Sequence, residues 1–62
     1  MICFQVSSLP KIGDCFTFHG RDYKLITFPE KSMLQGGLFK STARFKEGGA
    51  CIDETFYFEV SV

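Results

Sequence analysis

Polar and apolar residues alternate along most of this chain, and phenylalanine occupies many of the apolar positions. Phe16 and Phe18 lie two residues apart, as do Phe56 and Phe58. A period of two places side chains on one face of a β-strand. The pattern therefore predicts an all-β fold in which short strands enclose an aromatic core.

The alternation and the turn residues between its segments predict five strands in a single domain, residues 1–62. The strands are expected at residues 2–8, 13–19, 38–46 and 51–62, with a third strand that follows the turn at 19–22 and is ended by Pro29. Residues 29–35 are expected to form one helical turn, with Pro29 at its first position and Gly36 ending it. Tight connections favour an antiparallel meander that closes as a small, partly open barrel, SH3-like or OB-like. An open sheet with the 29–37 segment packed on one face is the alternative.

A turn at residues 19–22 is expected to join the second and third strands, because Gly20 supplies the positive φ that a two-residue hairpin loop needs. The loop residues are either Gly20 and Arg21 or His19 and Gly20. Both alternatives leave the same apolar side chains on one face. These side chains are Phe16, Phe18, Tyr23 and Leu25.

A second hairpin is expected to join the last two strands through a loop at residues 47–50. This register places Arg44 opposite Asp53 and Lys40 opposite Tyr57. A slip of one residue would turn the phenylalanines of both strands outward, so their burial selects the register.

The two hairpins together predict the core of the domain. The side chains expected to be largely buried are Phe16, Phe18, Tyr23, Leu25, Phe39, Phe45, Phe56 and Phe58. Glu54 falls beside Ala43 on the same face, which is tolerable only near the rim of the core or at a bulge.

Charge is balanced over the whole chain but unevenly placed. All seven basic residues lie within residues 1–46, and four of the seven acidic residues follow them. Alternation puts Lys40, Thr42, Arg44 and Lys46 on the solvent face of one strand, beside Tyr57. With Arg21 and Lys24 as extensions, this stripe resembles the cationic and aromatic surfaces that bind single-stranded nucleic acid. The alternative interpretation is an ordinary solvated sheet face, with Arg44 paired to Asp53.

Three cysteines and one histidine raise the question of a metal site or a disulfide scaffold. No two cysteines have the close spacing of structural zinc ligands, and Cys15 and His19 would lie about 13 Å apart in one strand. An odd number of cysteines, no signal peptide and no long apolar run favour reduced, metal-free thiols in the cytoplasm, with no membrane span.

Catalytic chemistry has little support in the sequence. His19, the only histidine, is expected at the tip of an exposed turn, where no nucleophile lies within hydrogen-bonding reach. Asp53 and Glu54 are adjacent in a strand and point to opposite faces, so they cannot share a proton-transfer task. The glycine pairs lack the lysine and hydroxyl residue of a phosphate-binding loop. We therefore expect no enzymatic activity, no cofactor and no small-molecule substrate.

The preferred function is that of a protein-binding module that acts through its sheet surface or a strand edge, with self-association as one form of it. The alternative is single-stranded nucleic-acid binding through the basic strand face 40–46. The candidate binding residues are Arg21, Lys24, Lys40, Arg44, Lys46 and Tyr57.

Overall fold

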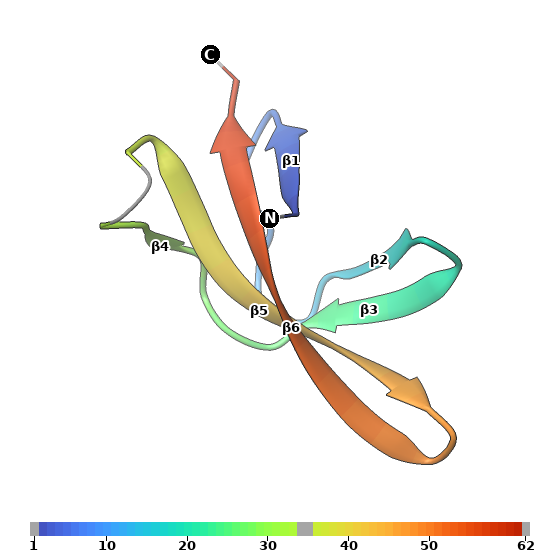
Figure 1. Ribbon diagram of the computed structural model, residues 1–62. Coiled ribbons are helices and arrows are strands. Elements are labelled where there is room, and N and C mark those ends of the chain that lie inside the picture. Colours follow the sequence, from blue (N-terminus) through green and yellow to red (C-terminus); the bar gives the residue numbers. More distant parts are fainter. Residues whose placement is uncertain (1, 34–35, 62) are drawn as a thin grey trace.

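The computed structural model describes residues 2–33 and 36–61. All regular structure in these residues is β, which confirms the predicted fold class (Figure 1). The strands are β1 (Cys3–Val6), β2 (Cys15–Phe18), β3 (Arg21–Leu25), β4 (Glu30–Lys31), β5 (Leu38–Glu47) and β6 (Ala50–Val60).

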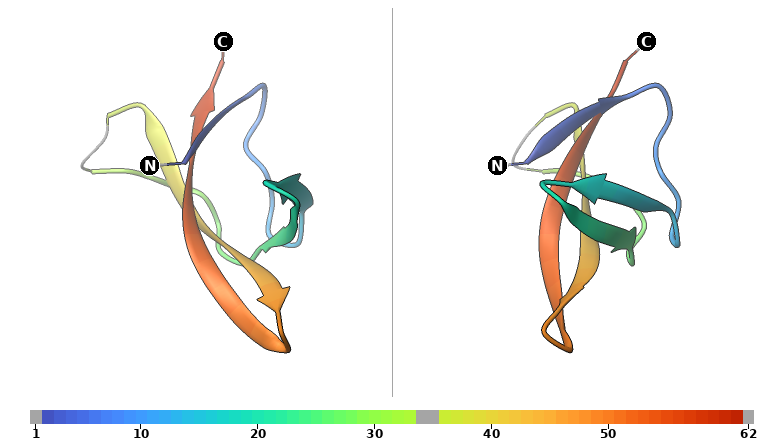
Figure 2. Two further views of the ribbon diagram at one scale, coloured as in Figure 1. Left: turned by 45° about the vertical axis from the view of Figure 1, so that its right-hand side comes forward. Right: turned by 90° about the vertical axis from the view of Figure 1, so that its right-hand side faces the viewer.

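The described strands form one sheet that curls into a half-barrel. Their order across the sheet is β1-β6-β5-β3-β2, and β4 pairs with β5 as well. The long β5–β6 hairpin crosses the whole molecule as its central element (Figure 1). The sheet curls so that β1 and β2, its two end strands, lie on the same side of this hairpin (Figure 2).

The register of the β5–β6 hairpin is the predicted one. Arg44 lies opposite Asp53 and Lys40 lies opposite Tyr57. The loop is shorter than expected, because the ladder continues to a last pair and leaves two glycines in the turn, with φ angles of 59° and 82°. Positive φ at both positions matches the right-handed twist of the strands that the turn joins.

The β2–β3 hairpin adopts the second of its two proposed registers. Phe18 pairs with Arg21 and Phe16 with Tyr23, so the loop consists of His19 and Gly20. His19 has a φ of 52° and Gly20 one of 74°. A hairpin turn with two positive φ angles favours asparagine or glycine, and histidine is among the residues that tolerate this conformation.

The prediction of an antiparallel meander is wrong at one position in the sheet. β1 pairs with β6, and the two strands run parallel, from Cys3 beside Tyr57 to Val6 beside Val60. Alternation along β1 correctly marks the residues that face the core. It carries no information about which strand lies beside β1 or in which direction, so the sheet is mixed.

The expected helical turn at residues 29–35 is wrong in the part that the structure describes. Glu30 and Lys31 form strand β4 and pair with Lys40 and Phe39 of β5. One isolated helical turn gains few hydrogen bonds for the residues it fixes, whereas an exposed strand edge offers backbone partners already in place. Residues 34 and 35 lie outside the described part of the chain.

Aromatic rings fill the concave side of the sheet. The Phe56 side chain has no solvent exposure, and its ring centroid lies 4.9 to 5.8 Å from those of four other rings. The buried apolar residues are Tyr23, Leu25, Leu38, Ala43, Phe45, Phe56 and Phe58. Phe16, Phe18 and Phe39 are partly buried and pack against this core. The predicted aromatic face is therefore confirmed.

Replacing Phe56 by Ala should destabilise the protein by about 3–5 kcal/mol, because the change leaves a cavity where four rings meet. A loss of this size is comparable to the whole stability of so small a domain. Phe28→Ala is the matched control, since the Phe28 side chain is 67% exposed and its removal should cost little. Urea unfolding of both variants measures the difference, and equal losses would contradict the assignment of the core.

Candidate functional site

The basic stripe lies on the convex face of the sheet, where it was predicted. Lys40, Arg44 and Lys46 of β5 are exposed, and Tyr57 of β6 is half-buried beside Lys40. Lys24 pairs with Arg44 across β3 and β5 and is exposed too. The structure thus brings five of the six candidate residues together on one face.

Arg21 is the exception, because its side chain lies on the core side of the sheet. Its guanidinium carbon lies 4.7 Å from the centroid of the Phe45 ring. One guanidinium nitrogen lies 3.8 Å from Glu54 and the other 3.6 Å from Glu47. Arg21 has the same parity in β3 as the buried Tyr23, so its arginine stem covers the open end of the core rather than extending the stripe.

Glu54 lies on the concave face of the β5–β6 hairpin, as the register required, and Glu47 at the end of β5 has the same facing. The hydroxyl of Tyr23 donates a hydrogen bond of 3.1 Å to the Glu54 carboxylate. Arg21 approaches the same carboxylate oxygen from the rim. A partly buried carboxylate is tolerated when it is both hydrogen-bonded and paired with a cation, and Glu54 meets both conditions.

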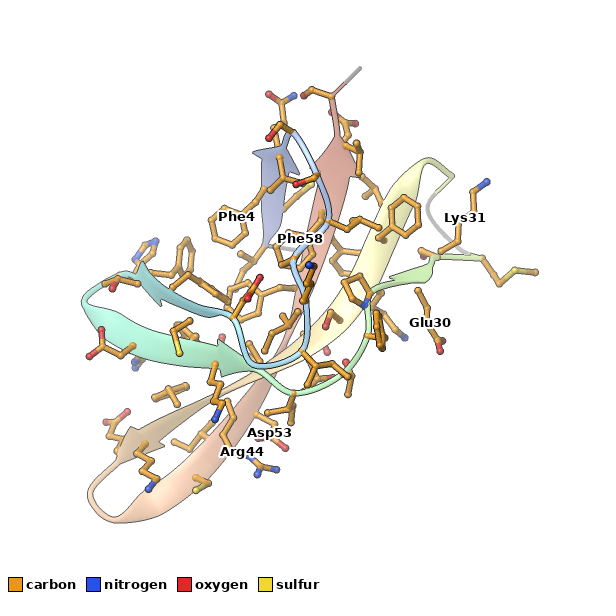
Figure 3. All side chains as sticks on the ribbon, turned by 180° about the vertical axis from the view of Figure 1, so that it is seen from behind. Phe4, Glu30, Lys31, Arg44, Asp53 and Phe58 are labelled. Carbon is orange, nitrogen blue, oxygen red and sulfur yellow. The ribbon has the colours of Figure 1, made fainter. Side chains whose placement is uncertain are left out.

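Arg44 and Asp53 form the closest ion pair among the described residues. Arg44 donates two hydrogen bonds to the carboxylate, of 2.7 and 3.2 Å (Figure 3). The hydrogen bond from Arg44 is the main reason why the pKa of Asp53 is lowered, and the same bond raises the pKa of Arg44. The pair therefore cancels part of the positive charge at the middle of the stripe.

Two hollows accompany the stripe along β5. The first, the hairpin cleft, has a volume of about 700 Å³ and opens where β3 and β5 diverge beyond the Lys24–Arg44 pair. The second, the outer groove, has a volume of about 540 Å³ and is lined by residues of β4, β5 and β6 together with the segment that precedes β4. Lys31 and Phe28, which the sequence analysis did not single out, line the outer groove with Lys40 and Tyr57.

A third hollow lies between the two end strands of the sheet. β1 and β2 each pair with one neighbour, so each has one unpaired edge among the described strands. The space between these edges, which we call the seam, has a volume of about 500 Å³. The ring of Phe4 crosses it and contacts Phe16 and Phe18 at centroid distances of 5.9 and 5.2 Å. Side-chain packing rather than backbone hydrogen bonding therefore joins the two ends of the sheet.

No family model, curated protein or solved structure matches this chain. Function must therefore be argued from its own residues. Across residues 2–33 and 36–61, no three histidine, cysteine or acidic side chains gather as metal ligands would. The same residues contain no helix with the length and apolar character needed to cross a membrane.

Replacing Arg44 by Gln should raise the pKa of Asp53 toward its ordinary value, because the main hydrogen bond to the carboxylate is lost. Because the pKa of Asp53 is lower in the folded protein, the pair stabilises the fold at pH values above the pKa of unfolded aspartate. That stabilisation disappears as pH falls through the folded value. Carbon-detected NMR titration of Asp53 measures the shift. Lys46→Gln, which removes a charge from the same strand without touching Asp53, is the control, and an equal shift in both variants would contradict the pairing.

Proposed function

We propose that this chain is a non-enzymatic protein-binding module that takes one extended segment of a partner protein into the seam. The observation that supports this proposal is the pair of unpaired strand edges, on β1 and β2, that flank an apolar hollow. Unpaired edges offer backbone donors and acceptors to a further strand. In this mode of recognition the main chain supplies affinity and alternate side chains supply specificity.

Neither edge strand contains the residues with which proteins usually block strand addition, and the β1–β2 connection lines only part of the seam, at Ser8, Leu9, Pro10 and Asp14. β1 has the sequence Cys-Phe-Gln-Val and β2 the sequence Cys-Phe-Thr-Phe, without a charged residue or a proline. Natural edge strands are commonly protected by lysine, proline or a bulge. Two unprotected strand edges beside one hollow favour a surface that binds a partner segment.

The walls of the seam favour a partner segment with alternating apolar residues. Its lining includes the apolar side chains Phe4, Val6, Leu9, Phe16 and Phe58. A strand bound along β2 would direct every second side chain toward these rings and the others toward solvent. The seam separates two strands of the same curled sheet, so we assign it to one extended segment rather than to the folded edge of a second copy.

We also propose a cytoplasmic location, on the strength of the thiols. Cys3, Cys15 and Cys51 are all exposed and form no disulfide. Exposed free thiols persist in a compartment that keeps cysteine reduced.

Replacing Thr17 by Pro should abolish binding at the seam, whereas Thr17→Ala should preserve it. In the two-residue hairpin, Phe18 and Phe16 direct their backbone groups to β3, so the amide of Thr17 points to the open edge. Proline removes that donor without removing a hydrogen bond within the hairpin. Both variants lose the 3.2 Å hydrogen bond from the Thr17 side chain to Asp22, which makes alanine the matched control.

Peptides selected from a random display library on the wild-type protein provide the probe. Fluorescence anisotropy should show a loss of at least tenfold in affinity for Thr17→Pro and little change for Thr17→Ala. Alkylation rates on the wild-type protein give a second measurement. A bound peptide should slow the alkylation of Cys15, on β2, but not of Cys51, at the far hairpin. Equal binding by both variants, failure to select any peptide, or unchanged alkylation of Cys15 would reject the proposal.

A further inference from the structure

We infer that the convex face of the sheet holds a second binding site, separate from the seam, for single-stranded nucleic acid. The site consists of the outer groove together with the basic stripe that continues from it along β5. Its distinguishing side chains are Phe28, Lys40 and Tyr57, all of which line the outer groove. The seam lies between β1 and β2, whereas the groove lies at β4, β5 and β6, so the two sites use different elements.

Two aromatic side chains give the groove surfaces on which bases can stack. Phe28 is 67% exposed although every other phenylalanine of the chain is buried or partly buried. Tyr57 is half-buried and held between two neighbouring strands, opposite Lys40 of β5 and beside Cys3 of β1. Proteins that bind single strands use exposed aromatic rings next to cations. The exposure of Phe28, in a molecule whose other phenylalanines pack in or against the core, favours such a role.

The cations form a continuous path from the groove. Lys40 borders the groove, and Lys46 lies six residues after it on the same face of β5, whereas Lys31 pairs with Phe39 and has the parity of the core face. At about 3.3 Å per residue, this path covers about 20 Å. Lys24 adds a further cation from the neighbouring strand. A path of this length suits about four nucleotides, at the lower end of the sites known for small barrels.

The lysines of this face are available for phosphate groups. Lys24, Lys40 and Lys46 form no ion pair with any residue in the described ranges, in contrast to Arg44. Four acidic residues on this face oppose an anionic ligand: Glu30 lies opposite Lys40, Asp53 binds Arg44, Asp22 has the parity of Lys24 in β3, and Glu59 has the parity of Tyr57 in β6. Glu30 and Lys31 project from β4 in opposite directions, and both lie some way from the Arg44–Asp53 pair (Figure 3). The groove end of the path is therefore the end that we assign to base recognition.

Stacking on Phe28 and Tyr57 requires unpaired bases, because the faces of bases in a duplex are already covered. The site should accordingly prefer single strands to duplexes of the same length. It should also show the salt dependence of phosphate contacts, with a slope of about 0.7 in log affinity per phosphate on a single strand.

Fluorescence anisotropy with a labelled oligothymidylate, measured at low and at moderate salt, tests the site. Phe28→Ala should weaken binding about 5- to 100-fold through lost stacking, and its stability should be close to that of the wild type. Lys40→Ala should weaken binding and reduce the salt slope by about 0.7, whereas Asp53→Asn should tighten binding by freeing Arg44. Lys11→Ala is the matched control, because Lys11 is an exposed lysine outside all three hollows.

Three results would overturn the inference. These are the absence of binding at low salt, equal effects of Lys40→Ala and Lys11→Ala, and equal affinity for single-stranded and duplex DNA. A polyglutamate peptide that binds as tightly as the oligonucleotide and is equally sensitive to Phe28→Ala would assign the groove to an acidic protein instead. Thr17→Pro should leave oligonucleotide binding unchanged. The experiments therefore distinguish a loss of peptide binding at the seam from a loss of nucleic-acid binding at this site.

Discussion

The packing of Phe56 against rings from three other strands is the interaction on which the curled sheet depends. Phe56 contacts Phe4 of β1, Phe16 and Phe18 of β2, and Tyr23 of β3. A single sheet has no second layer to cover its apolar face. It can bury that face only by curling over it. These contacts draw both ends of the sheet over β6, and they leave the convex face free to carry charge.

Alternation predicted the faces of the strands well, but not all of their neighbours. The spacing of phenylalanines in β5 and β6 determined the register, down to Arg44 opposite Asp53. The same kind of pattern could not show that β1 lies parallel to β6, because alternation is the same whichever way the neighbouring strand runs. Near Pro29 the local signals favoured a helical turn, and pairing with the free edge of β5 overrode them.

The candidate sites were predictable where they follow a single strand and not where they combine several. The stripe from Lys40 to Lys46 follows from the parity of β5. Arg21 does not extend it, because Arg21 has the parity of the buried Tyr23 in β3 and its side chain lies over the Phe45 ring. Phe28 ends the expected third strand with the parity of Lys24, on the face away from the core, and the structure places it beyond β3, which ends at Leu25. The seam depends on the curl of the whole sheet, which no local pattern encodes.

The pairing of β1 with β6 has a consequence for how the chain acquires its structure. Gln5 and Glu59, which hydrogen-bond across these strands, are 54 positions apart in the sequence. Contacts between such distant residues are slow to form, because a large loop must close before the contact is made. The two hairpins can assemble from local contacts alone, whereas β1 has no strand to join until β6 has been synthesised. Loop-closure entropy therefore predicts that β1 docks after the two hairpins have formed, and that its docking covers the aromatic rings of β2 and β6.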